Sequence, residues 1–415
     1  MELKKYKLGD IADIINGATP STSCEDNYDG EIVWITPKDL SEQKAKYVER
    51  GSRNIAQKGF NSCSAQMIPA YNILMSSRAP IGLLAINKAE CCTNQGFKNI
   101  VVDRSICDVD FLYYYLKYHI KEIEALGSGT TFKEVSKASL QQFEITIPSL
   151  DVQKHIASIL ADIDQKIALN RAINDNLEAM AKQLYDYWFV QFDFPNEEGK
   201  PYKSSGGKMV WNEKLKREIP EGWEVGNLSE FLQVVTERVS SSTVNEETKY
   251  APIEVLPRRR MSFNECASIE NAVSGLCAFQ KRNILLSNRR VYFHKVCIAA
   301  FDGITRDTVI VLKPANRDLL GYSYQLVNDD IFIEYATRHS YGSEQPVLSW
   351  ESAKIYKVLK PKSEFDDVYS KYANSIIDCV IKNELEIANL TKQRDELLPL
   401  LMNGQVSVNY HLSHD

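Results

Sequence analysis

The hydrophobic positions of the chain form two kinds of pattern, and each kind occurs twice. Residues 1–150 and 223–363 carry short aliphatic runs between turn residues, such as Ile100-Val101-Val102 and Val309-Ile310-Val311-Leu312. Runs of this length and composition predict β-strands. Helical stretches such as residues 108–125 lie between the runs. We therefore expect two compact globules of the α/β (α+β) class.

A long helix is expected after each globule, over residues 151–190 and 364–403. Apolar residues recur there at intervals of four and three, which is the spacing of a coiled-coil seam. Each helix would span about 57 Å, and Pro399 should kink or end the second one. The predicted seam consists of Ile156, Leu160, Ile163, Ile167, Asn170, Leu177 and Leu184 in the first helix and Ile376, Val380, Asn383, Ile387, Leu390 and Leu397 in the second.

Motifs that recur in the same order indicate that the chain is an internal duplication. The string Asn-Ile-Leu-Met-Ser-Ser-Arg at Asn72–Arg78 recurs as Asn-Ile-Leu-Leu-Ser-Asn-Arg at Asn283–Arg289. A repeat this long is not a solenoid period and indicates two copies of a whole domain. The other matching pairs are Leu8–Ile11 with Leu228–Phe231, and Val135-Ser136 with Leu348-Ser349.

Two matched seams in one chain should pair with each other. A parallel pairing would require the linker, residues 191–222, to return about 57 Å along the helix. We therefore favour an antiparallel coiled coil in which a pseudo-two-fold axis relates the globules. Asn170 and Asn383 occupy matched positions, so a buried Asn pair would fix the register. The alternative is that both are partly solvated helix positions.

The predicted organisation has six parts, which follow from the two patterns and the repeat. In chain order they are the first globule 1–150, the first spacer helix 151–190, the linker 191–222, the second globule 223–363, the second spacer helix 364–403 and the C-terminal tail 404–415.

Composition and motifs exclude several classes of protein. The nine Cys are scattered, without a Cys-x-x-Cys motif, so we expect reduced cytoplasmic thiols and no metal site. A transmembrane helix needs about 18 or more consecutive apolar residues, and the sequence has no such run and no secretory signal core. It also lacks the phosphate-binding loop of P-loop ATPases, the nucleophile elbow of hydrolases and the zinc-protease motif. No catalytic residue is therefore assigned.

The net charge of −6 averages over unlike parts of the chain. Residues 364–415 carry −5, whereas residues 223–363 carry +2. The second globule contains Arg258-Arg259-Arg260 and Arg289-Arg290, which suit contacts with phosphates and guanine. The alternative for such a run is a solvated surface patch.

The whole chain resembles the DNA-specificity (S) subunit of a type I restriction–modification enzyme. The first copy departs from the pattern at Gly127–Phe132, which lacks the Gln-Pro of the second copy, so that loop is expected to bind differently. Besides the repeated motifs, the resemblance rests on Gly342–Ser349, the end of the second helix at Leu397–Gly404, and the linker strings Phe192–Pro195 and Ile219–Trp223.

The resemblance implies a cytoplasmic, non-catalytic DNA-binding subunit of a restriction system that also methylates DNA. Each globule would be a target recognition domain for one half of a split, asymmetric site in double-stranded DNA. The helices would set the spacing and dock two adenine-N6 methyltransferase subunits, which motor-nuclease subunits join. S-adenosylmethionine, ATP and Mg²⁺ would bind the partner subunits, so no cofactor is expected in this chain, and no membrane is involved.

Residues beside the repeated motif are the main candidates for DNA contact. Arg78 and Arg289 occupy equivalent positions in the two copies of the repeat. Each therefore either contacts phosphate, reads a base or has a structural role in the fold. Arg290 lies opposite Ala79 and is a better candidate for readout by one copy alone. The full candidate set is Ser76, Ser77, Arg78, Thr130, Thr131, Lys133, Arg258, Arg259, Arg260, Ser287, Asn288, Arg289, Arg290, Ser343 and Gln345.

Two other functional classes compete with a DNA reader. One is an enzyme with its own nuclease or transferase activity, which the missing motifs disfavour. The other is a coiled-coil protein-binding adaptor without direct sequence readout.

Overall fold

The computed structural model describes residues 2–43, 46–129, 133–361 and 363–405. The chain forms two compact units. Unit 1 consists of Met1–Asp164 and Lys392–Asp415, and unit 2 consists of Gln165–Thr391. The helices α7 (Leu150–Tyr185) and α11 (Ser363–Met402) each contribute residues to both units.

Unit 1 is built around a five-stranded sheet with the order β2-β9-β6-β7-β5, in which β5 pairs parallel to β7 and the other pairs are antiparallel. The strands β1 and β10 pair antiparallel in a separate two-stranded sheet. The elements are β1 (Lys4–Lys7), α1 (Leu8–Ile11), β2 (Ala12–Asn16), η1 (Glu25–Asn27), β3 (Tyr28–Ile32), β4 (Trp34–Ile35), α2 (Pro37–Gln43), β5 (Tyr47–Val48), α3 (Gln57–Asn61), β6 (Ile73–Ser77), β7 (Ile81–Asn87), β8 (Cys92–Thr93), β9 (Phe97–Val102), α4 (Val109–Tyr118), α5 (Ile120–Ala125), α6 (Lys137–Gln141) and β10 (Glu144–Ile147).

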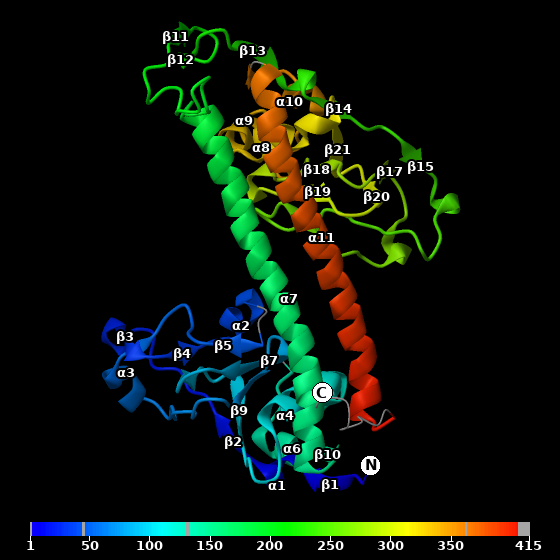
Figure 1. Ribbon diagram of the computed structural model, residues 1–415. Helices are drawn as coiled ribbons and strands as arrows, with labels where there is room; N and C mark the ends of the chain where they lie inside the picture. The colour runs from blue at the N-terminus through cyan, green and yellow to red at the C-terminus, as the bar shows by residue number, and fades with distance from the viewer. Residues whose placement is uncertain (1, 44–45, 130–132, 362, 406–415) are drawn as a thin grey trace, which may run out of the picture. The chain divides into compact units, whose positions relative to one another are not determined.

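Unit 2 repeats this topology, with the sheet order β14-β21-β18-β19-β16 and one parallel pair, β16 with β19. The predicted duplication is therefore confirmed at the level of the fold (Figure 1). The elements are η2 (Asp186–Val190), β11 (Met209–Asn212), β12 (Arg217–Pro220), β13 (Glu224–Asn227), η3 (Leu228–Glu230), β14 (Leu232–Val234), β15 (Arg238–Val239), η4 (Ser241–Thr243), β16 (Ser262–Phe263), η5 (Ile269–Asn271), β17 (Leu276–Phe279), β18 (Ile284–Ser287), η6 (Val291–Phe293), β19 (Val296–Ala299), β20 (Gly303–Arg306), β21 (Val309–Pro314), η7 (Arg317–Leu319), α8 (Leu320–Asn328), α9 (Asp330–Arg338), α10 (Trp350–Ala353) and β22 (Lys357–Lys360).

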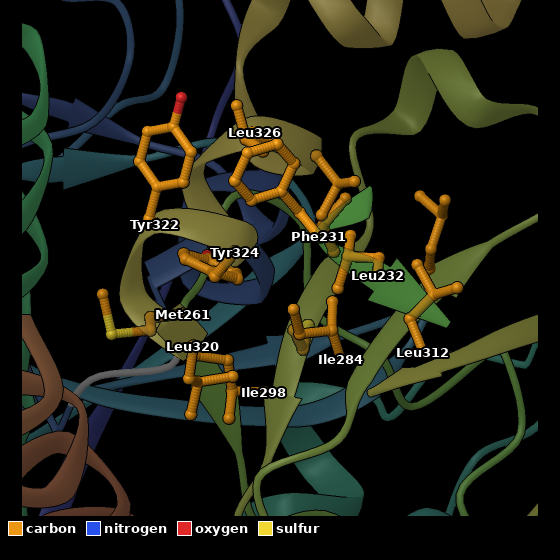
Figure 2. Packing of buried hydrophobic residues seen from close by; sticks show 14 of the residues in the cluster. Phe231, Leu232, Met261, Ile284, Ile298, Leu312, Leu320, Tyr322, Tyr324 and Leu326 are labelled. Carbon is orange, nitrogen blue, oxygen red and sulfur yellow. The ribbon is translucent and has the colours of Figure 1, made fainter. Parts of the chain in front are cut away.

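The repeated Asn-Ile-Leu motif is the central strand of each sheet. Every residue of β6 and of β18 is buried, which explains why these strands read as continuous apolar runs without alternation. Figure 2 shows that side chains of α8, including Leu320 and Tyr324, gather with Ile284 and Ile298 of the sheet in one core. Burial of this apolar surface is the main force that stabilises the unit.

The two long helices run antiparallel where they meet, as predicted. In unit 2, the Asn383 side chain donates a hydrogen bond to Asn174 (2.8 Å), and the rings of Trp188 and Tyr369 lie 5.7 Å apart. In unit 1, Arg394 of α11 donates to Asp164 of α7 (2.9 Å). Figure 1 traces both helices, α7 in green and α11 in orange to red.

The thirteen predicted seam residues are all buried or half-buried. The pairing of the asparagines differs from the predicted one, because Asn383 bonds to Asn174 and not to its sequence match Asn170. Asn174 in turn donates to Glu384 (3.0 Å). The Asn170 Nδ2 atom is buried and has no hydrogen bond within the described residues.

The linker contains more structure than its composition suggested, whereas the two helices end close to residues 190 and 403. The first helix continues from Tyr185 into a π-helical turn, η2, and Pro399 lies inside α11, which ends three residues later. Residues 191–222 contain the hairpin β11–β12. Phe192 and Phe194 are buried there against Trp223, with ring centroids 5.7 Å and 5.0 Å apart. This aromatic cluster orders a segment whose polar composition suggested a plain linker.

Three further features of the described residues bear on function. No described helix is long and apolar enough to cross a membrane. The described part of the chain contains no group of three or more His, Cys, Asp or Glu side chains arranged to hold a metal ion. All nine cysteines are free thiols.

Candidate nucleic-acid interface

In unit 2, isolated antiparallel bridges join the residues that follow β18 to the loop 341–348. Arg289 forms an antiparallel bridge with Val347, which bridges in turn to Tyr341. The Leu348 amide also donates to the Asn288 carbonyl oxygen (2.8 Å), and the Arg290 amide donates to Pro346 (3.1 Å). We call this assembly the unit 2 reading tip, and it consists of residues 287–292 and 341–348.

The unit 2 reading tip presents long polar and aromatic side chains to solvent. Arg289 and Gln345 are exposed, and the Arg289 guanidinium donates to the Gln345 amide oxygen at 3.3 Å. Tyr292 and Tyr341 are 50% and 63% exposed. Arg290 is exposed with a positive φ of 48°. Cationic and planar side chains of this kind suit contacts with phosphates and base edges.

Unit 1 builds the matching reading tip, residues 76–81 with 128–129 and 133–135, on the same backbone contacts. The Val135 amide donates to the Ser77 carbonyl oxygen (3.0 Å), as Leu348 does to Asn288. Ser128 bridges to Glu134 as Tyr341 bridges to Val347. The local backbone of the two tips is therefore conserved within the chain, although their side chains differ.

An ion pair underlies the unit 1 reading tip. Lys98 Nζ on β9 lies 2.9 Å from Glu134 Oε1, and the Lys98 side chain is only 9% exposed. Ser77 Oγ donates to the same carboxylate oxygen (3.3 Å), and Arg78 Nη1 lies 3.9 Å from Oε2. Partial burial alone would raise the pKa of the Glu134 carboxyl, but Lys98, Arg78 and Ser77 hold that pKa below its usual value.

Two of the candidate serines, Ser76 and Ser287, lie in the interior of the tips. Ser76 is buried, and its hydroxyl donates to the Pro80 carbonyl oxygen (2.7 Å) and accepts from the Leu83 amide (2.8 Å). Ser287 is also buried, and it donates to the Arg289 carbonyl oxygen (2.8 Å). Both hydroxyls are therefore committed to hydrogen bonds that shape the hairpins, and Asn288 similarly donates to the Asp307 carbonyl oxygen (2.7 Å).

The structure gives each residue of the predicted arginine clamp an intramolecular partner. The Arg258 guanidinium lies 4.0 Å from the ring centroid of Phe293. Arg259 pairs with Asp330 of α9 (2.9 Å), and Arg260 pairs with Asp175 of α7. These contacts favour a role in attaching the loop before β16 to neighbouring helices, and phosphate binding by the three residues stays a prediction.

The remaining candidates are placed as follows. Lys133 and Ser343 are exposed at the reading tips of unit 1 and unit 2. Thr130 and Thr131 lie outside the described residues.

Sequence reasoning missed Lys98, Glu134, Tyr292 and Tyr341 at these tips. The only local signal was that Glu134 precedes the repeated Val135-Ser136 motif. Lys98 is far from it in sequence, and their contact depends on the pairing of β6 with β9, which places Lys98 beside Met75. The exposure of the two tyrosines likewise depends on the tertiary structure.

Comparisons with known proteins agree with this architecture. The family model of the type I restriction modification DNA specificity domain matches residues 1–179. The MjaIX specificity subunit of the type I restriction enzyme of Methanocaldococcus jannaschii is 29% identical over 417 aligned residues, covering 97% of this chain and 93% of that subunit. The EcoR124I/EcoR124II specificity subunit of Escherichia coli is 26% identical over 48% of this chain and 50% of its own length.

A solved structure shares the fold. The crystal structure of a type I restriction–modification S subunit from M. genitalium matches 97% of this chain and 96% of its own, with a TM-score of 0.61 and 17% identity. At this identity the match establishes the arrangement of the backbone, and the roles of side chains must come from the chain itself.

Proposed function

Because the chain belongs to the family of type I restriction–modification DNA specificity subunits, we propose that its two reading tips each recognise one half of a split DNA site. The observation that carries this proposal is that one backbone design presents two different sets of side chains. Arg78 and Glu134 lie together on one tip, whereas Arg289, Gln345 and Tyr341 lie on the other. Two different surfaces on similar folds suit an asymmetric site.

The helices α7 and α11 supply the spacing in this proposal, and they also bind the partner subunits. Leu169, Ile173 and Met180 of α7 are 59%, 38% and 55% exposed. Their spacing of four and seven residues places them on one helix face, and an exposed apolar stripe of this kind marks an interaction site. We assign this stripe to a methyltransferase subunit, two of which would bind the chain before motor-nuclease subunits join.

Catalysis is assigned to the partners. In this proposal the chain is a non-catalytic subunit that positions the duplex, and a methyltransferase partner flips out the target adenine and methylates it. S-adenosylmethionine would bind that partner, and ATP with Mg²⁺ would bind the motor-nuclease subunits.

Reconstitution tests the proposal. The full chain, purified together with its methyltransferase partner, is incubated with a library of random duplexes, and the methylated molecules are sequenced. We expect one split sequence with a fixed spacer. Affinity for that site should also fall steeply as salt rises, because phosphate contacts release counterions. Methylation without sequence preference, or binding that is insensitive to salt, would instead support a protein-binding adaptor.

A further inference from the structure

Glu134 stands where unit 2 has an apolar residue. The hydrogen-bonded bridges Ser128–Glu134 and Tyr341–Val347 are equivalent, so Glu134 corresponds to Val347. Lys98 pairs with Met75 on β6, and Ile310 pairs with Leu286 on β18, so Lys98 corresponds to Ile310. Unit 1 therefore carries a charged pair in a place where the same backbone is built from two aliphatic residues in unit 2.

We propose that Glu134 is a specificity-determining residue, whose carboxylate accepts a hydrogen bond from the N4 amino group of a cytosine in the half-site read by unit 1. The inference rests on the proposed function and adds to it a named reading residue and a named base. It follows from three properties of the side chain. One carboxylate oxygen is available as an acceptor, the side chain lies on the tip, and the fold does not require its charge.

The first property is that the two carboxylate oxygens differ in their surroundings. Oε1 accepts from Lys98 Nζ (2.9 Å) and from Ser77 Oγ (3.3 Å). Oε2 is 3.9 Å from Arg78 and has no hydrogen bond within the described residues. One oxygen is thus anchored while the other keeps its acceptor capacity. A carboxylate accepts a hydrogen bond from cytosine N4 in the major groove.

The second property is that Glu134 shares its tip with an arginine. Bridge partners in antiparallel strands direct their side chains to the same face of the sheet, and in unit 2 this relation joins Arg289, Val347 and Tyr341. The Arg78 and Glu134 side chains are each 37% exposed in unit 1. Because Arg78 carries positive charge beside the carboxylate, it offsets the repulsion that Glu134 would feel near DNA phosphates.

The third property is that the fold has no need of this charge. A buried ion pair often stabilises a protein no more than aliphatic residues of similar volume do. Unit 2 forms the same reading tip with Ile310 and Val347 at the matching positions. A charged pair in a place where the fold does not require it points to a role in binding.

The test uses the full chain with its methyltransferase partner, after the split site has been determined. Each cytosine of the unit 1 half-site is replaced in turn by pyrimidin-2-one, which lacks the amino group, and affinity is measured by fluorescence anisotropy. We expect one cytosine whose replacement weakens binding by roughly 5- to 100-fold. Glu134→Gln should bind the normal and the modified duplex with nearly equal affinity, and so should the double variant Lys98→Ile/Glu134→Val, which copies the residues of unit 2.

Controls separate reading from folding. Glu90→Gln changes an exposed carboxylate outside the tip and should keep the full penalty for the modified base. If a variant fails to fold, the wild-type complex still tests the proposal. The assignment is overturned if loss of the amino group from none of the cytosines in that half-site weakens wild-type binding. It is also overturned if Glu134→Gln keeps the full penalty for the modified base. If the wild-type complex prefers no split site at all, the proposed function itself fails.

Discussion

The two reading tips use the same backbone hydrogen bonds but join hairpin to loop through different chemistry. In unit 1 the junction is ionic, because the buried Lys98 meets the partly exposed Glu134 and Arg78. In unit 2 the bridge runs through Val347, and the Arg289 side chain is held by the amide of Gln345. The comparison teaches that the same backbone accommodates either kind of junction, so the side chains at the tips can differ between the units, as the proposed reading of two different half-sites requires.

The attachment of each globule to the helices differs in the same way. In unit 1, Asp164 receives hydrogen bonds from Arg394 and from the Tyr114 hydroxyl (2.7 Å). In unit 2 a carboxylate at a different position, Glu384 of α11, accepts from Asn174 and Asn264. The first arrangement balances a positive against a negative charge, whereas the second keeps a carboxyl group among neutral amides.

The largest effect is expected when the ionic attachment of unit 1 is broken. Arg394→Met should lower the stability of unit 1 by about 3 kcal/mol, because it leaves Asp164 as a largely buried charge without its cation. Both side chains of this pair are under 20% exposed. Thermal unfolding monitored by hydrogen exchange of α4 measures the loss. Arg338→Met is the matched control, since its pair with Glu334 is exposed and should contribute less than about 0.5 kcal/mol. Equal losses in the two variants would contradict the account.

The next effect is a compensation between Lys98 and Glu134. Glu134→Val alone should destabilise unit 1 by about 2 kcal/mol, because the buried Lys98 ammonium then loses its carboxylate partner and keeps only the Ser77 hydroxyl, at 3.4 Å, as an acceptor. The double variant Lys98→Ile/Glu134→Val should recover most of that loss, since it reproduces the aliphatic pair of unit 2. Chemical denaturation of the three proteins checks the cycle. A double variant that is less stable than Glu134→Val would show that unit 1 cannot accommodate the aliphatic pair of unit 2.

The stabilities of the two units should also respond differently to pH, by a few kcal/mol at most. Burial raises the pKa of Glu178 in unit 2 to about 7. The folded protein therefore binds a proton that the unfolded chain releases, so the stability of unit 2 falls as pH rises from about 4.5 to 7 and then levels off. A pKa raised from 4.5 to about 7 corresponds to a drop of about 3 kcal/mol. Glu178→Gln should remove most of it, and hydrogen exchange in unit 2 measured from pH 5 to pH 8 tests this.

Glu134 should show the opposite sign in unit 1. Its folded-state pKa lies below the usual value, so its contribution is present above the unfolded pKa and is lost as pH falls through the folded value. Acidification should therefore loosen the unit 1 tip while it tightens the helix contacts of unit 2. A common pH response of both units would remove the basis for this contrast.

The smallest effect concerns the two asparagines of α7. Asn170→Leu should raise the stability of unit 2 by up to about 1 kcal/mol, because the buried Nδ2 atom has no hydrogen bond within the described residues. Asn174→Leu should instead lower it, since Asn383 and Glu384 lose their partner. Melting temperatures of the two variants decide the point, and a stabilising Asn174→Leu would show that the observed register is wrong.

The sequence predicted the duplication and the helices because both leave periodic or repeated patterns. The repeated motif that became β6 and β18 indicated the duplication, and the seam positions from Ile156 to Leu397 follow directly from apolar spacing. The tips were harder to predict, because Lys98 and Glu134 meet only through strand pairing. The Arg258–Arg260 run illustrates the same limit, since its ion pairs with Asp330 and Asp175 join residues far apart in sequence.

The central claim is that each unit reads its own half of one DNA site. It is tested most directly by sequencing the methylomes of cells that carry the partner subunits with either the wild-type chain or Arg290→Ala. The wild type should methylate one split motif, and the variant should relax one position in the half read by unit 2, by roughly 1–3 kcal/mol of discrimination, while the other half stays unchanged. Relaxation spread equally over both halves, or a wild-type methylome without a split motif, would contradict the claim.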